Sequence, residues 1–288
     1  SGFRPLWIGD VDGCTVFASE TCAIDAVNGT AIREVEPGEM VIVTESGVES
    51  MFLPMQEETS HCVFELLYLA RTDSVIFGES VADRRLEFGR RLAQEAPAQA
   101  DIVVGMPESA NVAALGYSQE SGIPFQFGIA RNQYVGRTFI QPKQSDRDFK
   151  VGVKINAIRA ILKGQRVVLV DDSLQRGTTL RSSVKKMRAA GATAVHVRIA
   201  APPTQWPCFY GVDTPTRQEL MASSHSLEEI RKYIRADSLG YLTTESMLSC
   251  VSKPKDYCTA CFDGLYPVAF EEQNLNQLSI DFSRDRDR

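Results

Sequence analysis

The chain has 288 residues, of which 43% are hydrophobic, and its net charge is −6. This length and apolar content are sufficient for one large domain, or a domain with an appendage, to bury a core. The acidic balance provides no basic footprint for nucleic acid. No apolar run approaches the roughly 20 residues of a membrane helix. Seven cysteines without small-domain spacing, and no secretory signal or Arg-rich presequence, favour a reduced, cytoplasmic compartment.

The first zone of the chain, residues 1–58, contains short apolar runs bounded by glycine. The runs at 6–9, 15–18 and 40–44 predict a small β meander. A second zone extends to about residue 250, and helical and strand patterns alternate along it. A third zone, from about residue 251, carries two cysteines and then a polar tail that we expect to be solvated.

The alternation in the second zone indicates the fold class. Helices are predicted over 84–95 and 112–120, and strands over 101–106, 125–129, 167–170 and 194–199. Strands separated by helices predict parallel βαβ units in a doubly wound sheet. Ligands bind such sheets outside the carboxyl ends of the strands, so functional residues are expected there.

Residues 167–180, VVLVDDSLQRGTTL, form the most informative stretch. Its apolar run without alternation predicts a strand that is covered on both faces. The strand runs into Asp171 and Asp172, which can accept hydrogen bonds from ribose hydroxyls or approach a metal ion. The loop from Ser173 to Thr179 supplies hydroxyls and backbone N–H groups at a helix N-terminus, where phosphate is favoured.

The helix after this loop is predicted by its apolar spacing. Leu180, Val184 and Met187 recur at i, i+4 and i+7, and Gly191 suits the position just past the helix end. A generic strand–turn–helix with an acidic end is the alternative interpretation. The sequence Arg-Gly-Thr-Thr in the loop disfavours that alternative.

The stretch resembles the motif with which type I phosphoribosyltransferases bind 5-phosphoribosyl-1-pyrophosphate (PRPP). In that family the two acids contact the ribose hydroxyls and the loop binds the 5′-phosphate. The resemblance therefore assigns PRPP binding to the acids and to the loop residues Ser173, Arg176, Gly177, Thr178 and Thr179. Leu174 and Gln175 replace the Ile-Val that is usual in the amidotransferase branch, which a loop that binds phosphate through its main chain should tolerate.

Further segments occur in one order and extend the resemblance to about residue 272. They are CVFELLYLARTDS (62–74), GMPES (105–109), YVGRTFIQP (134–142), PCFYGVD (207–213) and YCTACF (257–262). Together they look like the glutamine PRPP amidotransferase family, which commits PRPP to purine synthesis. The resemblance implies a pentosyltransferase that forms 5-phosphoribosylamine and pyrophosphate from PRPP and ammonia, with glutamine as the ammonia source in the full-length enzyme.

Residues 1–58 are similar to the C-terminal part of a class II glutaminase domain. In that family an N-terminal cysteine attacks glutamine, whereas this sequence starts with Ser1 and holds only a short part of the domain. Cys14 and Cys22 lie inside predicted strands and are expected to be buried, inert thiols. We therefore expect no glutaminase activity from this chain alone. A fragment, a split subunit and an enzyme that uses free ammonia all remain open.

The resemblance also implies domain limits and a pyrophosphate site. It divides the chain into the glutaminase-like residues 1–58, a phosphoribosyltransferase domain over 59–250, and a terminal segment over 251–288. The turn after the strand near 103 binds pyrophosphate in the family, which assigns Pro107, Glu108 and Ser109 to the PRPP site. On its own this turn is a weak signal.

The polar segment 131–154 matches the family's flexible loop, which closes over PRPP and excludes water. Arg137 and Lys154 can neutralise pyrophosphate charge; solvated surface residues are the alternative. Arg131 and Gln133 stand where the family commonly has Lys and Arg. With Asp171 and Asp172, which we expect to approach Mg²⁺, the two cations complete the predicted catalytic set.

The cysteines are the second chemical signal. Cys258 and Cys261 form a CxxC pair, whose spacing alone is equally compatible with zinc, a redox pair and an iron–sulfur cluster. The cluster-bearing branch of the family implies that Cys62 and Cys208 join them as ligands of a [4Fe–4S] cluster with a structural or regulatory role. Four unmetallated core thiols are the alternative. Cys250 is expected to be a core residue.

Two functional hypotheses of different class follow. One is the enzyme; the other is a non-catalytic PRPP-sensing regulatory or scaffold protein with the same fold, as in some purine repressors. A salvage phosphoribosyltransferase is a minor third, because it needs a hood that binds a nucleobase. The family also implies purine nucleotides as feedback inhibitors and a homo-oligomer, either a dimer or a tetramer.

Overall fold

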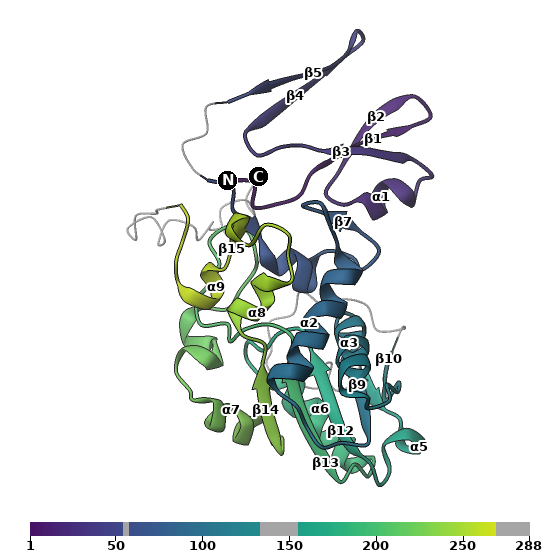
Figure 1. Cartoon of the computed structure of the whole chain (residues 1–288), viewed down its shortest axis with the longest axis vertical. Coiled ribbons are helices and arrows are strands. Elements are labelled where there is room, and N and C mark those ends of the chain that lie inside the picture. Colours follow the sequence, from purple (N-terminus) through teal and green to yellow (C-terminus); the bar gives the residue numbers. More distant parts are fainter. Residues whose placement is uncertain (54–57, 133–154, 269–288) are drawn as a thin grey trace, which may run out of the picture.

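The computed structural model describes residues 1–53, 58–132 and 155–268. An all-β part occupies one end of the molecule and a mixed α/β part the other (Figure 1). The N-terminus lies between the two parts. No helix in these described ranges has both the length and the apolar character to cross a bilayer.

The all-β part confirms the predicted meander. It consists of β1 (Trp7–Val11), β2 (Cys14–Ala18), α1 (Thr21–Asp25), β3 (Thr30–Glu34), β4 (Glu39–Thr44) and β5 (Gly47–Phe52). The first three strands form an antiparallel sheet in the order β2-β1-β3, and the last two form a separate hairpin. The expectation for the two thiols was wrong in part: Cys22 is buried in a helix, not a strand, and Cys14 is exposed.

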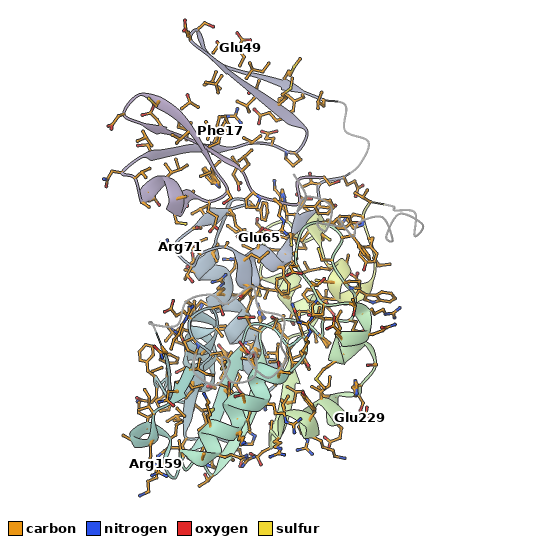
Figure 2. All side chains as sticks on the ribbon, turned by 180° about the vertical axis from the view of Figure 1, so that it is seen from behind. Phe17, Glu49, Glu65, Arg71, Arg159 and Glu229 are labelled. Carbon is orange, nitrogen blue, oxygen red and sulfur yellow. The ribbon has the colours of Figure 1, made fainter. Side chains whose placement is uncertain are left out.

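The α/β part is built on a parallel sheet in the order β14-β13-β12-β9. The strands are β9 (Ile102–Gly105), β12 (Arg166–Asp171), β13 (Ala194–Ile199) and β14 (Ser238–Tyr241). The helices α2 (Val81–Glu95) and α3 (Asn111–Ser121) cover one face, and α6 (Thr178–Ala189) covers the other (Figures 1 and 2). Residues 167–170 are all 0% exposed, which confirms a strand covered on both faces.

One predicted strand is wrong. Residues 125–129 contribute only an isolated bridge between Phe125 and Val103, and the strand β10 (Ile129–Arg131) starts where the prediction ends. The chain turns first, because the N–H of Gly128 donates to the carbonyl of Gln126 at 2.9 Å. β10 then pairs with β11 (Ile155–Ala157), which precedes α5 (Arg159–Leu162). The sequence patterns also missed β14 and α7 (Leu227–Ile234).

The predicted helices are present with extended ends. α2 starts at Val81 because the Ser80 hydroxyl accepts the N–H of Asp83 at 3.3 Å and caps the helix. In α6 the residues Leu180, Val184 and Met187 are buried as predicted. Short elements complete the chain: β6 (His61–Cys62), the π-helical turn η1 (Glu65–Leu69), β7 (Val75–Ile76), β8 (Glu79–Ser80), the 3₁₀ turns η2 (Arg217–Glu219), η3 (Met221–Ser223) and η4 (Pro254–Asp256), α8 (Thr244–Ser249), β15 (Tyr257–Cys258) and α9 (Ala260–Asp263).

The helices α2 and α3 approach each other through a glycine from each. A Cβ atom on Gly89 would lie 1.9 Å from the carbonyl oxygen of Ala113, and one on Gly116 would lie 1.9 Å from the carbonyl oxygen of Leu86. Both glycines therefore permit backbone contact that no larger residue allows. This contact sets how α2 covers the sheet.

We expect Gly89→Ala to destabilise the protein by about 1–3 kcal/mol, the usual cost of overpacking a core. Alanine has the higher helix propensity, which favours the variant by roughly 1 kcal/mol in an exposed helix. The sign of the measured change therefore separates the two effects. Denaturant unfolding followed by circular dichroism gives it, and a gain in stability would contradict the close helix contact.

Candidate functional site

The acid pair lies at the carboxyl end of β12, as the sequence predicts. Asp172 is 7% exposed and its two carboxylate oxygens accept different hydroxyls. The Ser109 hydroxyl donates to Oδ2 at 2.5 Å, and the Ser173 hydroxyl donates to Oδ1 at 2.8 Å. Ser109 follows β9, the strand beside β12. The structure therefore brings the predicted pyrophosphate turn and the predicted ribose acids into direct contact.

Burial controls the electrostatics of the pair. It raises the pKa of Asp171 well above its ordinary value, and the neighbouring charge of Asp172 adds to the rise. Burial also raises the pKa of Asp172, while the hydrogen bonds from Ser109 and Ser173 oppose the rise. A buried carboxylate beside a half-buried one favours a ligand that supplies hydroxyl donors or a hard cation such as Mg²⁺.

The loop after the acids, residues 173–177, presents a helix N-terminus. Leu174 is 2% exposed and anchors the loop in the core. Gly177 adopts a left-handed φ of 68° immediately before α6, and it supplies no side-chain cap. The first N–H groups of a helix have no partner within the helix. Those of Thr178 and Thr179 are therefore suited to donate hydrogen bonds to an anion.

Arg176, a predicted PRPP contact, has a carboxylate partner. Its guanidinium group donates to Oε1 of Glu219 through Nε at 3.1 Å and through Nη2 at 2.9 Å. Sequence reasoning missed Glu219. The signal was present as Thr216-x-x-Glu219, because Glu219 closes a capping box with Thr216.

Arg85 is a second residue that sequence reasoning missed. It is 3% exposed and donates to the carbonyl of Leu66 at 2.9 Å, the carbonyl of Ala70 at 2.7 Å and the hydroxyl of Thr72 at 3.0 Å. Its positive charge lowers the pKa of Asp172. A charged residue on the otherwise apolar face of α2 was the available signal.

Both cations that the sequence predicts for the pyrophosphate fall outside the described part of the chain. Arg137 and Lys154 lie outside the described residues, as does Gln133. Arg131 is described and is exposed at the end of β10. Pro107 and Glu108 occupy the turn between β9 and α3, beside the acid pair.

The structure brings the predicted cysteines together around one cavity. β6 pairs in parallel with β15, which places Cys62 opposite Cys258. Cys261 follows in α9, and Cys208 comes from the loop after β13. All four side chains line the same cavity, with the aromatic rings of Phe3, Tyr210 and Tyr266. Sequence patterns alone could not join Cys62 and Cys208 to the CxxC pair.

Burial favours the neutral form of three thiols in this cavity. Burial raises the pKa of Cys62 to about 12, and it also raises the pKa of Cys258 and Cys261. Among the residues with described coordinates, no three His, Cys, Asp or Glu side chains are arranged to hold a single metal ion. The thiols surround a cavity rather than one point. Cys250 is 4% exposed, away from this cavity, as expected of a core residue.

The all-β part is joined to the loop between η1 and α2 by side-chain contacts. Glu20 accepts the N–H of Arg71 at 2.6 Å and the hydroxyl of Ser74 at 2.8 Å. Arg4 and Glu65 form an ion pair at 2.5 Å. Figure 2 shows Glu65 and Arg71 where the two parts meet. The loop that leads into α2 is therefore held from the N-terminal side.

Comparison with known families agrees with this geometry. Residues 84–204 match the family described as the phosphoribosyl transferase domain. That segment contains β9, β12, β13 and the loop after the acid pair. The fold is therefore that of a type I phosphoribosyltransferase domain.

Longer matches identify the branch. The chain is 49% identical to the amidophosphoribosyltransferase of Bacillus subtilis over 96% of its own length and 59% of the relative's. It is 47% identical to the chloroplastic enzyme of Glycine max, over 97% of the chain and 49% of the relative. The solved glutamine PRPP amidotransferase of B. subtilis with ADP and GMP superposes with a TM-score of 0.87 at 48% identity, over 94% of this chain and 61% of that chain. The chain belongs to the amidophosphoribosyltransferase family and spans about half the length of these curated relatives.

We expect Asp171→Asn to raise the unfolding free energy by about 1–2 kcal/mol at neutral pH, the usual gain when a strained active-site group is removed. The raised pKa of Asp171 means that the folded state binds its proton more tightly than the unfolded state does. Wild-type stability therefore falls as pH rises above the ordinary value of 3.8, and the advantage of the variant grows over the same window. Thermal unfolding between pH 4 and pH 8 measures this difference in stability between the variant and the wild type. Asp83→Asn is the control, because Asp83 is exposed. A variant less stable than the wild type at neutral pH would refute the expectation.

Proposed function

We propose that this chain carries the phosphoribosyl-transfer half of an amidophosphoribosyltransferase. It forms 5-phosphoribosylamine and pyrophosphate from PRPP and ammonia, the first step of purine synthesis. The observation that carries the proposal is the contact between Ser109 and Asp172 at 2.5 Å. This contact joins the turn assigned to pyrophosphate and the acids assigned to ribose at one sheet edge.

The residues divide the substrate among them. The N–H groups and hydroxyls from Ser173 to Thr179 receive the 5′-phosphate. Asp171 and Asp172 accept the ribose hydroxyls. The turn with Pro107, Glu108 and Ser109 receives the pyrophosphate. This arrangement leaves the anomeric carbon between the acids and the turn, as in-line transfer requires.

The reaction needs no nucleophile from the protein. The bond between C1 and the pyrophosphate oxygen breaks and the electron pair stays on that oxygen. The nitrogen of ammonia forms the new bond to C1 and then loses a proton. The acid pair fits Mg²⁺, which would neutralise charge on the leaving group. We include Arg137 and Lys154 as further cations for pyrophosphate.

We assign residues 1–58 to the end of a glutaminase domain, 59–250 to the transferase domain and 251–288 to a terminal segment. Support for the first assignment comes from apolar side chains on the β4–β5 hairpin. Met40, Ile42, Val48, Met51 and Phe52 are 40–62% exposed there. Such a surface fits a further layer of the same domain. Where such a layer is present, we propose that it releases ammonia from glutamine.

The loop from Ser173 to Thr179, here called the phosphate loop, also provides a site for feedback inhibition. A purine nucleotide carries the same 5′-phosphate as PRPP, so the N-terminus of α6 can receive either ligand. The relative from B. subtilis was solved with ADP and GMP. We propose purine nucleotides as inhibitors, and a homo-oligomer in the cytoplasm or a similarly reducing compartment as the working form.

The cysteine cavity fits a cluster better than a single ion. Four thiolates are the usual donors of a [4Fe–4S] cluster, and the four thiols line a cavity instead of meeting at one point. The raised pKa values of Cys62, Cys258 and Cys261 mean that a positive centre is needed to hold these three side chains as thiolates. We therefore propose that Cys62, Cys208, Cys258 and Cys261 hold this cluster in a structural or regulatory role.

Anaerobic turnover tests the activity. With PRPP, Mg²⁺ and concentrated ammonium salt we expect pyrophosphate release, and with glutamine in place of ammonium we expect none. Asp172→Asn should lose about 10²–10³ in rate, because one oriented electrostatic contact is removed. Asp83→Asn is the control. PRPP binding without pyrophosphate release would instead favour the non-catalytic PRPP sensor.

Anaerobic reconstitution with iron and sulfide tests the cluster. We expect about four iron and four sulfide per chain, as a [4Fe–4S] centre requires. Cys261→Ser should lose most of the bound iron, and Cys250→Ser, which changes a buried thiol outside the cavity, should retain it. Retention of iron by Cys261→Ser, or tight zinc binding without sulfide, would exclude the cluster.

A further inference from the structure

The segment from residue 208 to residue 221, here called the bridging segment, starts at the cysteine cavity. The N–H of Cys208 donates to the hydroxyl of Thr214 at 2.7 Å, which closes the segment on itself beside the cavity. The N–H of Tyr210 donates to Sγ of Cys208 at 3.3 Å. This end of the segment is therefore shaped around the Cys208 side chain.

A second contact fixes the segment to the CxxC side of the cavity. The guanidinium group of Arg217 stacks over the ring of Trp206, 3.5 Å from its centroid. The N–H of Trp206 in turn donates to the carbonyl of Cys261 at 3.1 Å. Two of the four cavity cysteines are thus tied to the segment by independent contacts.

The far end of the bridging segment holds the phosphate loop. Glu219 binds the Arg176 side chain at 2.9 Å, and the N–H of Met221 donates to the carbonyl of Gln175 at 2.9 Å. A Cβ atom on Gly177 would lie 2.8 Å from Sδ of Met221. Three consecutive residues of the phosphate loop are therefore in contact with Glu219 or Met221.

Hydrogen bonds within the middle of the bridging segment fix its conformation. The Thr216 hydroxyl and N–H both donate to Oε2 of Glu219, at 3.0 and 3.1 Å. The turns η2 and η3 follow directly, and Leu220 between them is 0% exposed. The other carboxylate oxygen of Glu219 is the one that binds Arg176. One side chain therefore both caps the turn and holds the loop.

We propose that Glu219 is a positioning residue for the phosphate loop, and that the bridging segment transmits the state of the cysteine cavity to that loop. A change at Cys208 shifts the segment, and Glu219 and Met221 carry the shift to residues 175–177. The inference rests on the proposed function for the identity of the phosphate ligand. Coupling between two sites is reciprocal, so a ligand at the loop must also order the cavity end.

The experiment perturbs each end separately. Cys208→Ala alters the cavity, and Cys250→Ala is its control because that thiol is buried elsewhere. Glu219→Gln breaks the charged contact at the loop. Glu228→Gln is its control, because Glu228 has a similar ion pair with Arg231 at 2.6 Å within α7. Two double variants, Glu219→Gln with Cys208→Ala and Glu219→Gln with Cys250→Ala, complete a double-mutant cycle and its control.

Two readouts are measured on the full chain. Amide hydrogen exchange at residues 173–179 reports the order of the loop without any ligand, with the β9 amides as an internal reference for global unfolding. Calorimetric titration with PRPP and Mg²⁺ reports the affinity. We expect Cys208→Ala to speed exchange at the loop and to weaken PRPP binding by about fivefold or more, the lower range of coupling between sites. Glu219→Gln should do the same, and the double variant should add little to either.

The reciprocal effect is the sharpest test. PRPP should slow exchange of the amides from Cys208 to Thr214 in the wild type and in Glu228→Gln, but not in Glu219→Gln. Additive effects in the double variant, or loop exchange that Cys208→Ala leaves unchanged, would overturn the proposal. If the wild type does not bind PRPP, the proposed function fails, and the exchange of the unliganded variants still decides the coupling.

Discussion

The parallel pairing of β12 with β9 on one side and β13 on the other is the constraint on which the site depends. Because residues 167–170 are buried on both faces, the polar side chains of this strand are confined to its two ends, and the acids are those at the carboxyl end. Parallel neighbours end at the same edge, so the turn after β9 must reach the acids after β12. The hydrogen bond from Ser109 to Asp172 is the direct result. The raised pKa values of the acid pair follow from desolvation at this edge of the sheet.

The cysteine cavity depends instead on contacts between segments that are far apart in the sequence. Its thiols come from a strand near the start of the transferase region, from the loop after β13 and from the last described turn. The N-terminal residues take part directly, because Phe3 lines the cavity and its carbonyl accepts the N–H of Cys62 at 3.0 Å. The cavity therefore combines the N-terminal segment before β1, the strand β6, the loop after β13 and the terminal elements β15 and α9.

The cysteine cavity and the acid pair are connected through shared segments of the chain. The bridging segment contacts both the cavity and the phosphate loop. On another side, Arg85 holds the carbonyls of the turn that follows Cys62 and places a positive charge near Asp172. The loop from 70 to 77 is held in turn by Glu20 from the all-β part.

The sequence by itself determined the fold class and the strand that carries the acids, because these depend on local patterns. Ordered motifs also singled out the four cysteines that line one cavity. The sequence also predicted the helix face of Leu180, Val184 and Met187, which is buried. It failed at residues 125–129, where a turn through Gly128 interrupts an apolar run, and at Cys22, which lies in a helix. Only the tertiary structure decided that Cys62 and Cys208 line one cavity with the CxxC pair. The same holds for the ion pair of Arg176 with Glu219 and for the hydrogen bond from Arg85 to the carbonyl of Leu66. Each of these contacts joins residues far apart in the chain, and period and spacing carry no information about which distant segments a packed core brings together.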